Sequence, residues 1–319
     1  MELHQRIDTH VHYLPPAYEA MLDRRNLLTL DGGFPRPKWS EEGLFRQMEE
    51  LNIPYSLLSI SSPHLHMNDS QEAIETARSC NEYGAGLGDR YPDNIGIMAS
   101  LPLPEVEASI AEVRACQKMP SVKGFALLTN SCGIYLGDPL LDPVMEVLNE
   151  IHAVVSVHPG MPGAVPEGIH PGLPYPFMEF FFDTTRAVAN MILHGIPKRY
   201  PNICFIIPHA GAFVPILSDR LATLPSICPD MKDIDVMRDL SAFYYDLAGI
   251  SMPKQYDVLR KITDDSHLLY GSDAPFTPAP MCEKLAAEMD QKLGEEMMDL
   301  VYLKNPGKLF GERIPHLIV

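Results

Sequence analysis

Short runs of apolar and β-branched residues recur along the whole chain, and longer amphipathic stretches separate them. A short apolar run bounded by proline, glycine or polar residues is typical of a buried strand. Eight such runs occur, at residues 7–12, 55–61, 94–102, 122–128, 153–159, 204–211, 243–249 and 267–273.

Several of the intervening stretches have the spacing of helices. Residues 103–117 carry valine and isoleucine at helical intervals, and 69–90 opens with Asp–Ser, which suits a helix N-cap. The segments 138–152 and 184–200 have the same character. Eight strand-like runs separated by helices predict an α/β fold, a single (β/α)8 TIM barrel.

The order of segments also predicts the domain organisation. The sequence shows no break in composition and no internal repeat, so we expect one domain over residues 1–319. The segment from about 14 to 43 is irregular and too long for a tight connection after the first strand. We expect it to be an insertion that covers the barrel mouth. Residues 159–176 are rich in proline, which excludes a helix or a central strand and predicts a long, stiff loop.

Composition narrows the class of protein. With 46% hydrophobic and 21% charged residues, the chain can bury a large core, and disorder is not expected. The formal net charge of −17 argues against nucleic-acid binding, which needs a basic surface. No apolar run is long enough to span a membrane, and MELHQRID has no export-signal core. The six cysteines form no CxxC pair, so we expect free thiols and a cytoplasmic location.

Metal-binding and acid–base side chains stand at the ends of several strand-like runs, where TIM barrels carry their chemistry. These residues are His10, His12, His158, His209 and Asp273. Alternation along a strand sends His10 and His12 to the same side. A lone histidine at a strand end is more often structural, but five such residues at the ends of four runs are not expected by chance. Imidazole and carboxylate ligands suit zinc, manganese or iron, and an open coordination position makes such a site catalytic.

Several of these segments resemble one enzyme superfamily. RIDTHVH, VVSVHPG, FIIPHAGAFVPILSDRL, LLYGSDAPF and the closing NPGKLFG are similar to the amidohydrolase superfamily, over almost the whole chain and in order. They resemble more narrowly its decarboxylase-rich branch, which includes aminocarboxymuconate semialdehyde, γ-resorcylate and 6-methylsalicylate decarboxylases. The resemblance implies one divalent metal ion, with Zn²⁺ preferred and Mn²⁺ as the alternative. It implies as ligands His10, His12, His158 and Asp273.

The resemblance also implies roles for residues around the metal. His209 matches the catalytic histidine of the family, and Arg36, in the insertion, matches an arginine that grips the substrate carboxylate. The fourth strand-like run has its only lysine, Lys123, at its beginning rather than at its end, where binuclear relatives carry a carboxylated lysine. One metal ion is therefore expected. Relatives in this branch are often oligomeric, so we expect a homodimer or homotetramer. On position alone, His170 in the proline-rich loop is a second candidate for substrate contact.

Two further features stay open. PHLHMN carries a second H-x-H pair, His64 and His66, in a polar loop after the second run. This position favours a loop that lines the substrate site, or is simply solvated, over a second metal site. Asp8 lies on the same side of its strand as His10 and His12, which makes it a candidate to orient a ligand histidine.

These observations predict a metal-dependent, non-oxidative decarboxylase of a small hydroxylated aromatic or muconate-type carboxylic acid. The carbon that bears the carboxylate must be protonated before the C–C bond breaks, and Asp273 or a water handled by His209 would deliver the proton. The alternative is a metal-dependent hydrolase or lactonase, in which Asp273 or His209 takes a proton from water that attacks a small ester or lactone. A non-catalytic barrel is disfavoured, because structural zinc is usually enclosed by four protein ligands.

Overall fold

The computed structural model describes residues 3–166, 168 and 172–315, and its core is a sheet of eight strands. Each strand pairs in parallel with the next one in the sheet. In sheet order the strands are β1 (Ile7–His12), β4 (Tyr55–Ser59), β5 (Ile95–Ser100), β6 (Val122–Leu128), β9 (Val154–His158), β10 (Cys204–Ile207), β11 (Tyr244–Asp246) and β12 (Leu268–Leu269).

The first and last strands of this sheet also meet. The backbone N–H of Thr9 donates to the carbonyl of Tyr270 at 3.0 Å, and that of Asp273 donates to the carbonyl of His10 at 2.8 Å. These bonds close the sheet on itself, because they join β1 to the segment that directly follows β12. The predicted (β/α)8 barrel is confirmed.

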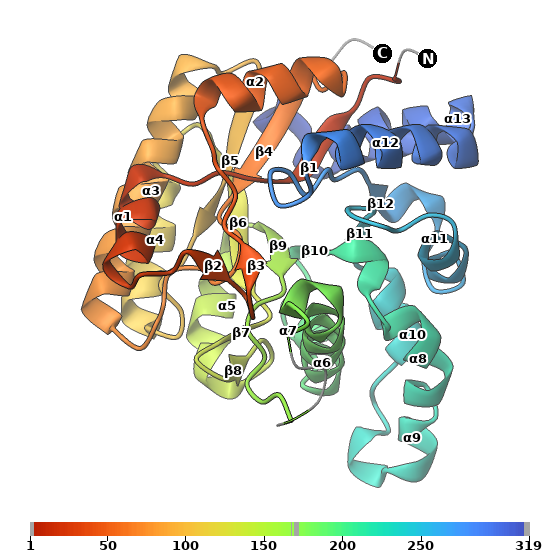
Figure 1. The fold of residues 1–319 in the computed structure, drawn as a ribbon. Helices are drawn as coiled ribbons and strands as arrows, with labels where there is room; N and C mark the ends of the chain where they lie inside the picture. The colour runs from red at the N-terminus through yellow and green to blue at the C-terminus, as the bar shows by residue number, and fades with distance from the viewer. Residues whose placement is uncertain (1–2, 167, 169–171, 316–319) are drawn as a thin grey trace.

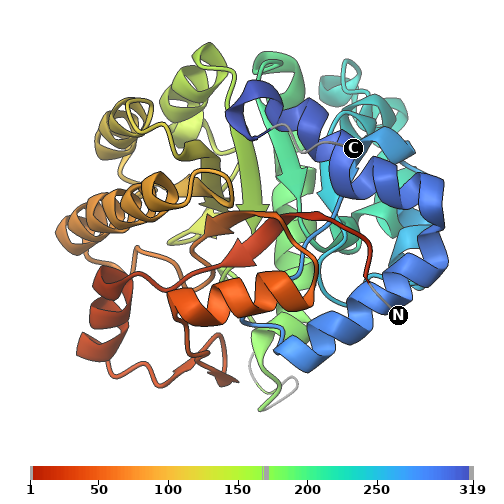
Figure 2. The same ribbon diagram turned by 90° about the horizontal axis from the view of Figure 1, so that it is seen from above.

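Helices lie on the outside of the barrel and connect its strands (Figures 1 and 2). The longest is α3, and its predicted N-cap is confirmed, because the Asp69 side chain accepts from the backbone N–H of Glu72 at 3.0 Å. The helices are α1 (Pro16–Arg24), α2 (Glu41–Glu50), α3 (Ser70–Arg90), α4 (Val106–Cys116), α5 (Asp142–Glu150), α6 (Glu179–Leu193), α7 (Ile196–Arg199), α8 (Val214–Leu221), α9 (Leu224–Ile227), α10 (Val236–Ser241), α11 (Lys254–Leu259), α12 (Ala279–Leu293), α13 (Glu295–Asp299) and α14 (Asn305–Phe310).

Several element boundaries differ from the sequence-based expectation, and two of the differences are large. Helix α6 begins at Glu179, before the segment 184–200 that was expected to be helical. Its first two turns bury Phe180 and Asp183, so packing extends the helix beyond its clear amphipathic part. Strand β12 is only two residues long, although the apolar run predicted 267–273. Beyond it the chain leaves regular strand geometry, and Asp273 has a φ of +58°.

Two short hairpins stand at one end of the barrel (Figure 1). One pairs β2 (Thr29–Leu30) with β3 (Phe34–Pro35), within the segment after β1, and the other pairs β7 (Asn130–Ser131) with β8 (Ile134–Tyr135). Strands of two residues are too short to leave an alternating pattern, which is why the sequence did not indicate them. The first hairpin contacts the proline-rich loop, since the backbone N–H of Tyr175 donates to the carbonyl of Asp31 at 2.8 Å.

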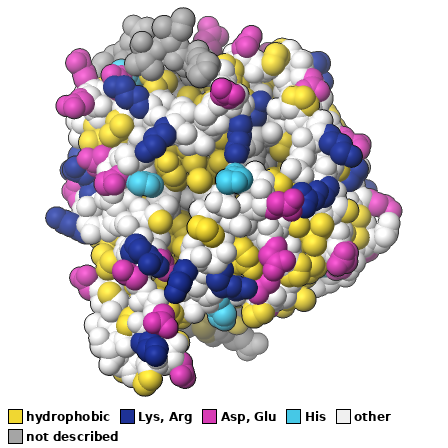
Figure 3. Space-filling view, turned by 180° about the vertical axis from the view of Figure 1, so that it is seen from behind, with side chains coloured by type: hydrophobic (Ala, Val, Ile, Leu, Met, Phe, Trp, Pro, Cys, Tyr) yellow, Lys and Arg dark blue, Asp and Glu magenta, His cyan; other side chains and the backbone are white. Residues whose placement is uncertain are grey.

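None of the described helices combines the length and the apolar character needed to cross a lipid bilayer. On the face seen in Figure 3, Lys and Arg side chains are interspersed with Asp and Glu rather than gathered in one basic area.

The seam between β12 and β1 gives a stability prediction. A Cβ atom at Gly271 would lie 2.6 Å from the Cβ of His10 and 3.0 Å from that of Ala248, so Gly271→Ala forces two strands apart. We expect a loss of about 1–3 kcal/mol in the free energy of unfolding, the usual cost of overpacking, measured by denaturant titration. The matched control is Gly86→Ala in α3, where a Cβ meets nothing within 4 Å. It should leave stability unchanged or raise it, because alanine favours a helix. Equal stability of the two variants would contradict the close approach at the seam.

Candidate active site

Four of the predicted site residues converge at the C-terminal end of the barrel. One ligand atom from each of His10, His12, His158 and Asp273 lies within 4.8 Å of all the others. The Nε2 atoms of His10 and His12 are 3.1 Å apart, and Asp273 Oδ1 lies 3.5 Å from the first and 3.3 Å from the second. The imidazoles of His10, His12 and His158 are all buried.

The orientation of the three imidazoles fits a cation. In each ring the Nδ1 atom faces an oxygen acceptor. The neutral ring therefore carries its proton on Nδ1, and its Nε2 atom has a lone pair that can bind a metal ion. The acceptors are Asp246 Oδ2 for His10 at 2.8 Å, the Ser59 carbonyl for His12 at 3.4 Å, and the Pro159 carbonyl for His158 at 2.7 Å. When all three rings are neutral, their Nε2 lone pairs and the carboxylate face one buried point, and a cation at that point offsets their repulsion. The residues present therefore fit a divalent metal ion.

The charges around this point favour a cation there. Burial lowers the pKa of His10, but the carboxylates of Asp246 and Asp273 outweigh burial and raise it to about 10. Burial raises the pKa of Asp273, but hydrogen bonds from His10, His12 and His209 hold it well below its usual range. Two ionised carboxylates thus surround the nitrogen atoms, and a metal ion would supply the charge that neutralises them.

Sequence reasoning missed Asp246, the last residue of β11. One of its carboxylate oxygens accepts from His10 Nδ1, and the other accepts from the backbone N–H of His209 at 3.0 Å. It is fully buried. The filter that selected the other site residues, a polar residue at a strand end, also applies to the run FYYDLAG and would have found it. Asp8 Oδ1 accepts from the backbone N–H groups of His10 and Ser272, each at 3.1 Å, and among the described residues it makes no hydrogen bond to an imidazole.

His209 lies beside the four converging residues without joining them. Its Nε2 atom is 3.9 Å from Asp273 Oδ2, and its ring stacks on Phe181 with centroids 6.0 Å apart. Its φ of +53° is uncommon for a residue with a side chain, and the bond to Asp246 fixes this backbone. The ring therefore lies next to both the acid and the imidazole of His10, with ring centroids 5.0 Å apart, where a proton-transfer group would be useful.

The two predicted substrate contacts are not tested by this geometry. The guanidinium of Arg36 lies on α1, bonded to Asp23 Oδ1 at 2.6 Å and to Glu19 Oε1 at 3.3 Å. It would have to leave these carboxylates to grip a substrate, so its role stays a prediction. His170 lies outside the described residues.

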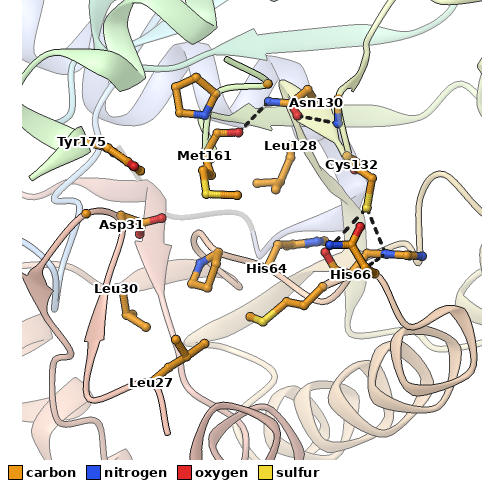
Figure 4. A pocket seen from close by; sticks show the side chains of 18 of the residues that line it. Leu27, Leu30, Asp31, His64, His66, Leu128, Asn130, Cys132, Met161 and Tyr175 are labelled. Atoms are coloured by element: carbon orange, nitrogen blue, oxygen red, sulfur yellow. Dashed lines mark hydrogen bonds between the residues drawn. The ribbon is translucent and has the colours of Figure 1, made fainter. Parts of the chain in front are cut away.

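A cavity of about 730 Å³ lies between the two hairpins (Figure 4). Leu128 forms part of its wall and is the sheet neighbour of His158. His64 and His66 line the same cavity. Among the described residues, the candidate metal cluster comprises only the four residues named above, so the second H-x-H pair is not part of one.

Comparison with known proteins places the chain in a family. Residues 7–311 match the family described as amidohydrolase. The chain belongs to the amidohydrolase family. The chain is 31% identical to the 6-methylsalicylic acid decarboxylase of Penicillium expansum over 287 residues, which cover 86% of each protein. The resemblance drawn from the sequence motifs is thus confirmed.

Solved structures agree with this assignment. The crystal structure of a protein described as amidohydrolase II superposes with a TM-score of 0.91 at 35% identity, covering 96% of this chain and 99% of that one. A 5-carboxyvanillate decarboxylase from Novosphingobium aromaticivorans, complexed with manganese, superposes with a TM-score of 0.84, covering 96% of each chain. At 19% identity the second likeness supports the fold alone.

The contact between Asp246 and His10 gives a prediction for this amidohydrolase. Asp246→Asn removes the charge that holds the Nδ1 proton of His10, so the ring loses its fixed tautomer and orientation. We expect metal affinity to fall about 10- to 100-fold, as for other partners of metal-binding histidines. Competition with a chelating dye measures it. Asp219→Asn, at an exposed position of α8, is the matched control and should bind metal like the native protein. Native affinity in the Asp246 variant would refute the orienting role.

His158→Ala tests the cluster from the opposite wall of the barrel. Loss of one imidazole from the donor set should lower the bound metal well below one ion per chain after dialysis. Elemental analysis of the dialysed protein measures this content. Unchanged occupancy would remove His158 from the ligand set.

Proposed function

We propose that this protein is a metal-dependent, non-oxidative decarboxylase of a small hydroxylated aromatic acid. The observation that carries the proposal is the buried cluster of imidazoles and an acid, with His209 beside that acid. The 6-methylsalicylic acid decarboxylase named above supports the same reaction class, and membership of the amidohydrolase family supports metal-dependent chemistry. The chain is accordingly an enzyme, a carboxy-lyase of this superfamily.

Aromatic side chains around the cluster support a ring-shaped substrate. Phe276 packs edge-on against His12 with ring centroids 5.4 Å apart, and Phe180 lies 6.2 Å from His158 in the same manner. Phe34, from the β2–β3 hairpin, lies 6.2 Å from Phe276. Flat apolar walls beside a cationic centre suit a molecule that has an aromatic face and a carboxylate.

Residues of the protein would orient the carboxylic acid substrate and supply a proton to it. A divalent ion bound by the cluster supplies positive charge to the substrate carboxylate and its neighbouring hydroxyl. Asp273 and His209 stand together at the edge of the cluster, with Oδ2 and Nε2 3.9 Å apart. From there either Asp273, once it has itself taken up a proton, or a water handled by His209 delivers a proton to the ring carbon that bears the carboxylate, after which the C–C bond breaks and CO2 leaves. Phe181 stacks on the His209 ring and holds its orientation.

We propose Zn²⁺ as the ion, because three imidazole nitrogens and one carboxylate oxygen are common zinc ligands. Manganese is the alternative that the distant carboxyvanillate decarboxylase supports. Metal analysis of the protein purified without added metal distinguishes them.

Further assignments extend the proposal to the whole chain. We assign residues 1–319 to one catalytic domain and 14–43 to the insertion that covers its mouth, supported by the contact of Phe34 with Phe276. A homodimer or homotetramer and a cytoplasmic location are further proposals. Six free cysteines support the location.

Product analysis tests the reaction class directly. The metal-loaded protein is incubated in ¹⁸O-water with 6-methylsalicylate, dihydroxybenzoates and aminocarboxymuconate semialdehyde. We expect CO2 release from a hydroxylated benzoate and no ¹⁸O in the organic product. Ring opening of ester or lactone substrates with ¹⁸O in the product, and no CO2 from any acid, would establish the hydrolase instead.

His209→Asn tests the proton-transfer role. His209 does not belong to the donor cluster, so the variant should hold the native amount of metal. Turnover should fall at least about 100-fold, the usual effect of losing an acid–base group. The matched control is His152→Asn. His152 is exposed and is not one of the candidate site residues, so this variant should keep native activity. Loss of metal from the His209 variant would show instead that His209 is a ligand.

A further inference from the structure

Three side chains from consecutive loops meet beside the 730 Å³ cavity, and two of them, His66 and Cys132, line its wall. Cys132 lies in the turn between β7 and β8, His66 lies in the segment after β4, and Glu105 is the N-cap of α4. The Sγ atom of Cys132 is 3.1 Å from His66 Nδ1, and His66 Nε2 is 3.2 Å from Glu105 Oε1. Figure 4 shows Cys132 and His66 directed toward each other.

The surrounding hydrogen bonds fix the tautomer of His66. The backbone N–H of Asn68 donates to Nδ1 at 3.2 Å, so Nδ1 is an acceptor and the ring proton lies on Nε2. That proton is donated to Glu105, which also accepts from Ser70 Oγ at 2.6 Å. Hydrogen bonds from Ser70 and His66 lower the pKa of Glu105, so its carboxylate stays ionised. The basic nitrogen of His66 therefore faces the thiol, and a carboxylate holds the ring from behind, as in enzymes with activated thiols.

The cavity also offers a polar group to a bound molecule. His64 lines it, its residue surface is only 4% exposed, and its Nε2 atom has no hydrogen-bond partner among the described residues. A buried polar nitrogen without a partner costs free energy that a ligand can recover. A small polar molecule that reaches His64 lies in the same cavity as the Cys132 thiol.

The other thiols are less suited to react. Cys80, Cys116 and Cys282 are buried, and burial raises the pKa of each, to about 12 for Cys80. Cys204 and Cys228 are partly buried. Cys132 is the one exposed cysteine of the six.

We propose that Cys132 is a modification site, a thiol nucleophile that forms mixed disulfides with small disulfides entering the cavity. His66 Nδ1 takes the thiol proton, and the thiolate attacks one sulfur of the incoming disulfide. A bond forms between that sulfur and Cys132, the disulfide's own S–S bond breaks, and the leaving thiolate takes the proton from His66. Cys132 is oxidised and the incoming disulfide is reduced. This inference is independent of the proposed decarboxylase activity.

The test is the reaction of the native, full-length protein with dithiobis(nitrobenzoate), a small aromatic disulfide whose released thiolate is coloured. We expect one thiol to react rapidly, and mass spectrometry of peptides to place the adduct on Cys132. Cys132→Ser should abolish the rapid phase, whereas the control Cys228→Ser should retain it. His66→Ala should slow it about tenfold, because a free thiol is only slightly ionised at neutral pH. Added imidazole should restore the rate, which a merely structural role of His66 would not allow.

Two results would overturn the proposal. One is a rapid phase that survives in Cys132→Ser. The other is a His66→Ala protein that reacts as fast as the native one, or whose slow reaction imidazole does not restore. Thermal unfolding of each variant establishes that the comparison is made on folded protein.

Discussion

Closure of the barrel between its first and last strands is the constraint on which the candidate active site depends. The backbone bond from Asp273 to His10 is part of that closure, and the same two residues supply ligand atoms to the cluster. Residues separated by most of the chain length are therefore held together by the sheet itself. The absence of a side chain at Gly271 allows the close approach, since a Cβ there would collide with His10.

Asp246 connects the structural and the chemical parts of the site. Its carboxylate is buried, which is costly unless hydrogen bonds and charge compensate for the loss of water. The imidazole of His10 and the backbone of His209 provide those bonds, so the acid is stabilised while it fixes both histidines. The metal cluster and the proposed proton-transfer group thus share one anchor at the end of β11. This arrangement explains why His209 can stand next to Asp273 without entering the cluster.

Most of the barrel and much of the site could be predicted from the sequence. Periodic runs gave β1 and β6 with their observed bounds, because buried strands need continuous apolar stretches. His10, His12, His158 and Asp273 were expected at strand ends, and the fold brings them together. The two hairpins could not be predicted, because strands of two residues are too short to show an alternating pattern of apolar and polar residues. The contact of Cys132 with His66 depends on how loops after different strands meet, and single-sequence patterns carry no such information.

The central claim is that one buried point at the end of the barrel holds a divalent ion. A crystal structure of the protein grown with Zn²⁺ or Mn²⁺, with anomalous scattering recorded at the absorption edge of the metal, tests it most directly. The account predicts a single strong anomalous peak about 2.0–2.3 Å from the Nε2 atoms of His10, His12 and His158 and from a carboxylate oxygen of Asp273. A peak at another place, or none at this point with metal in excess, would contradict it.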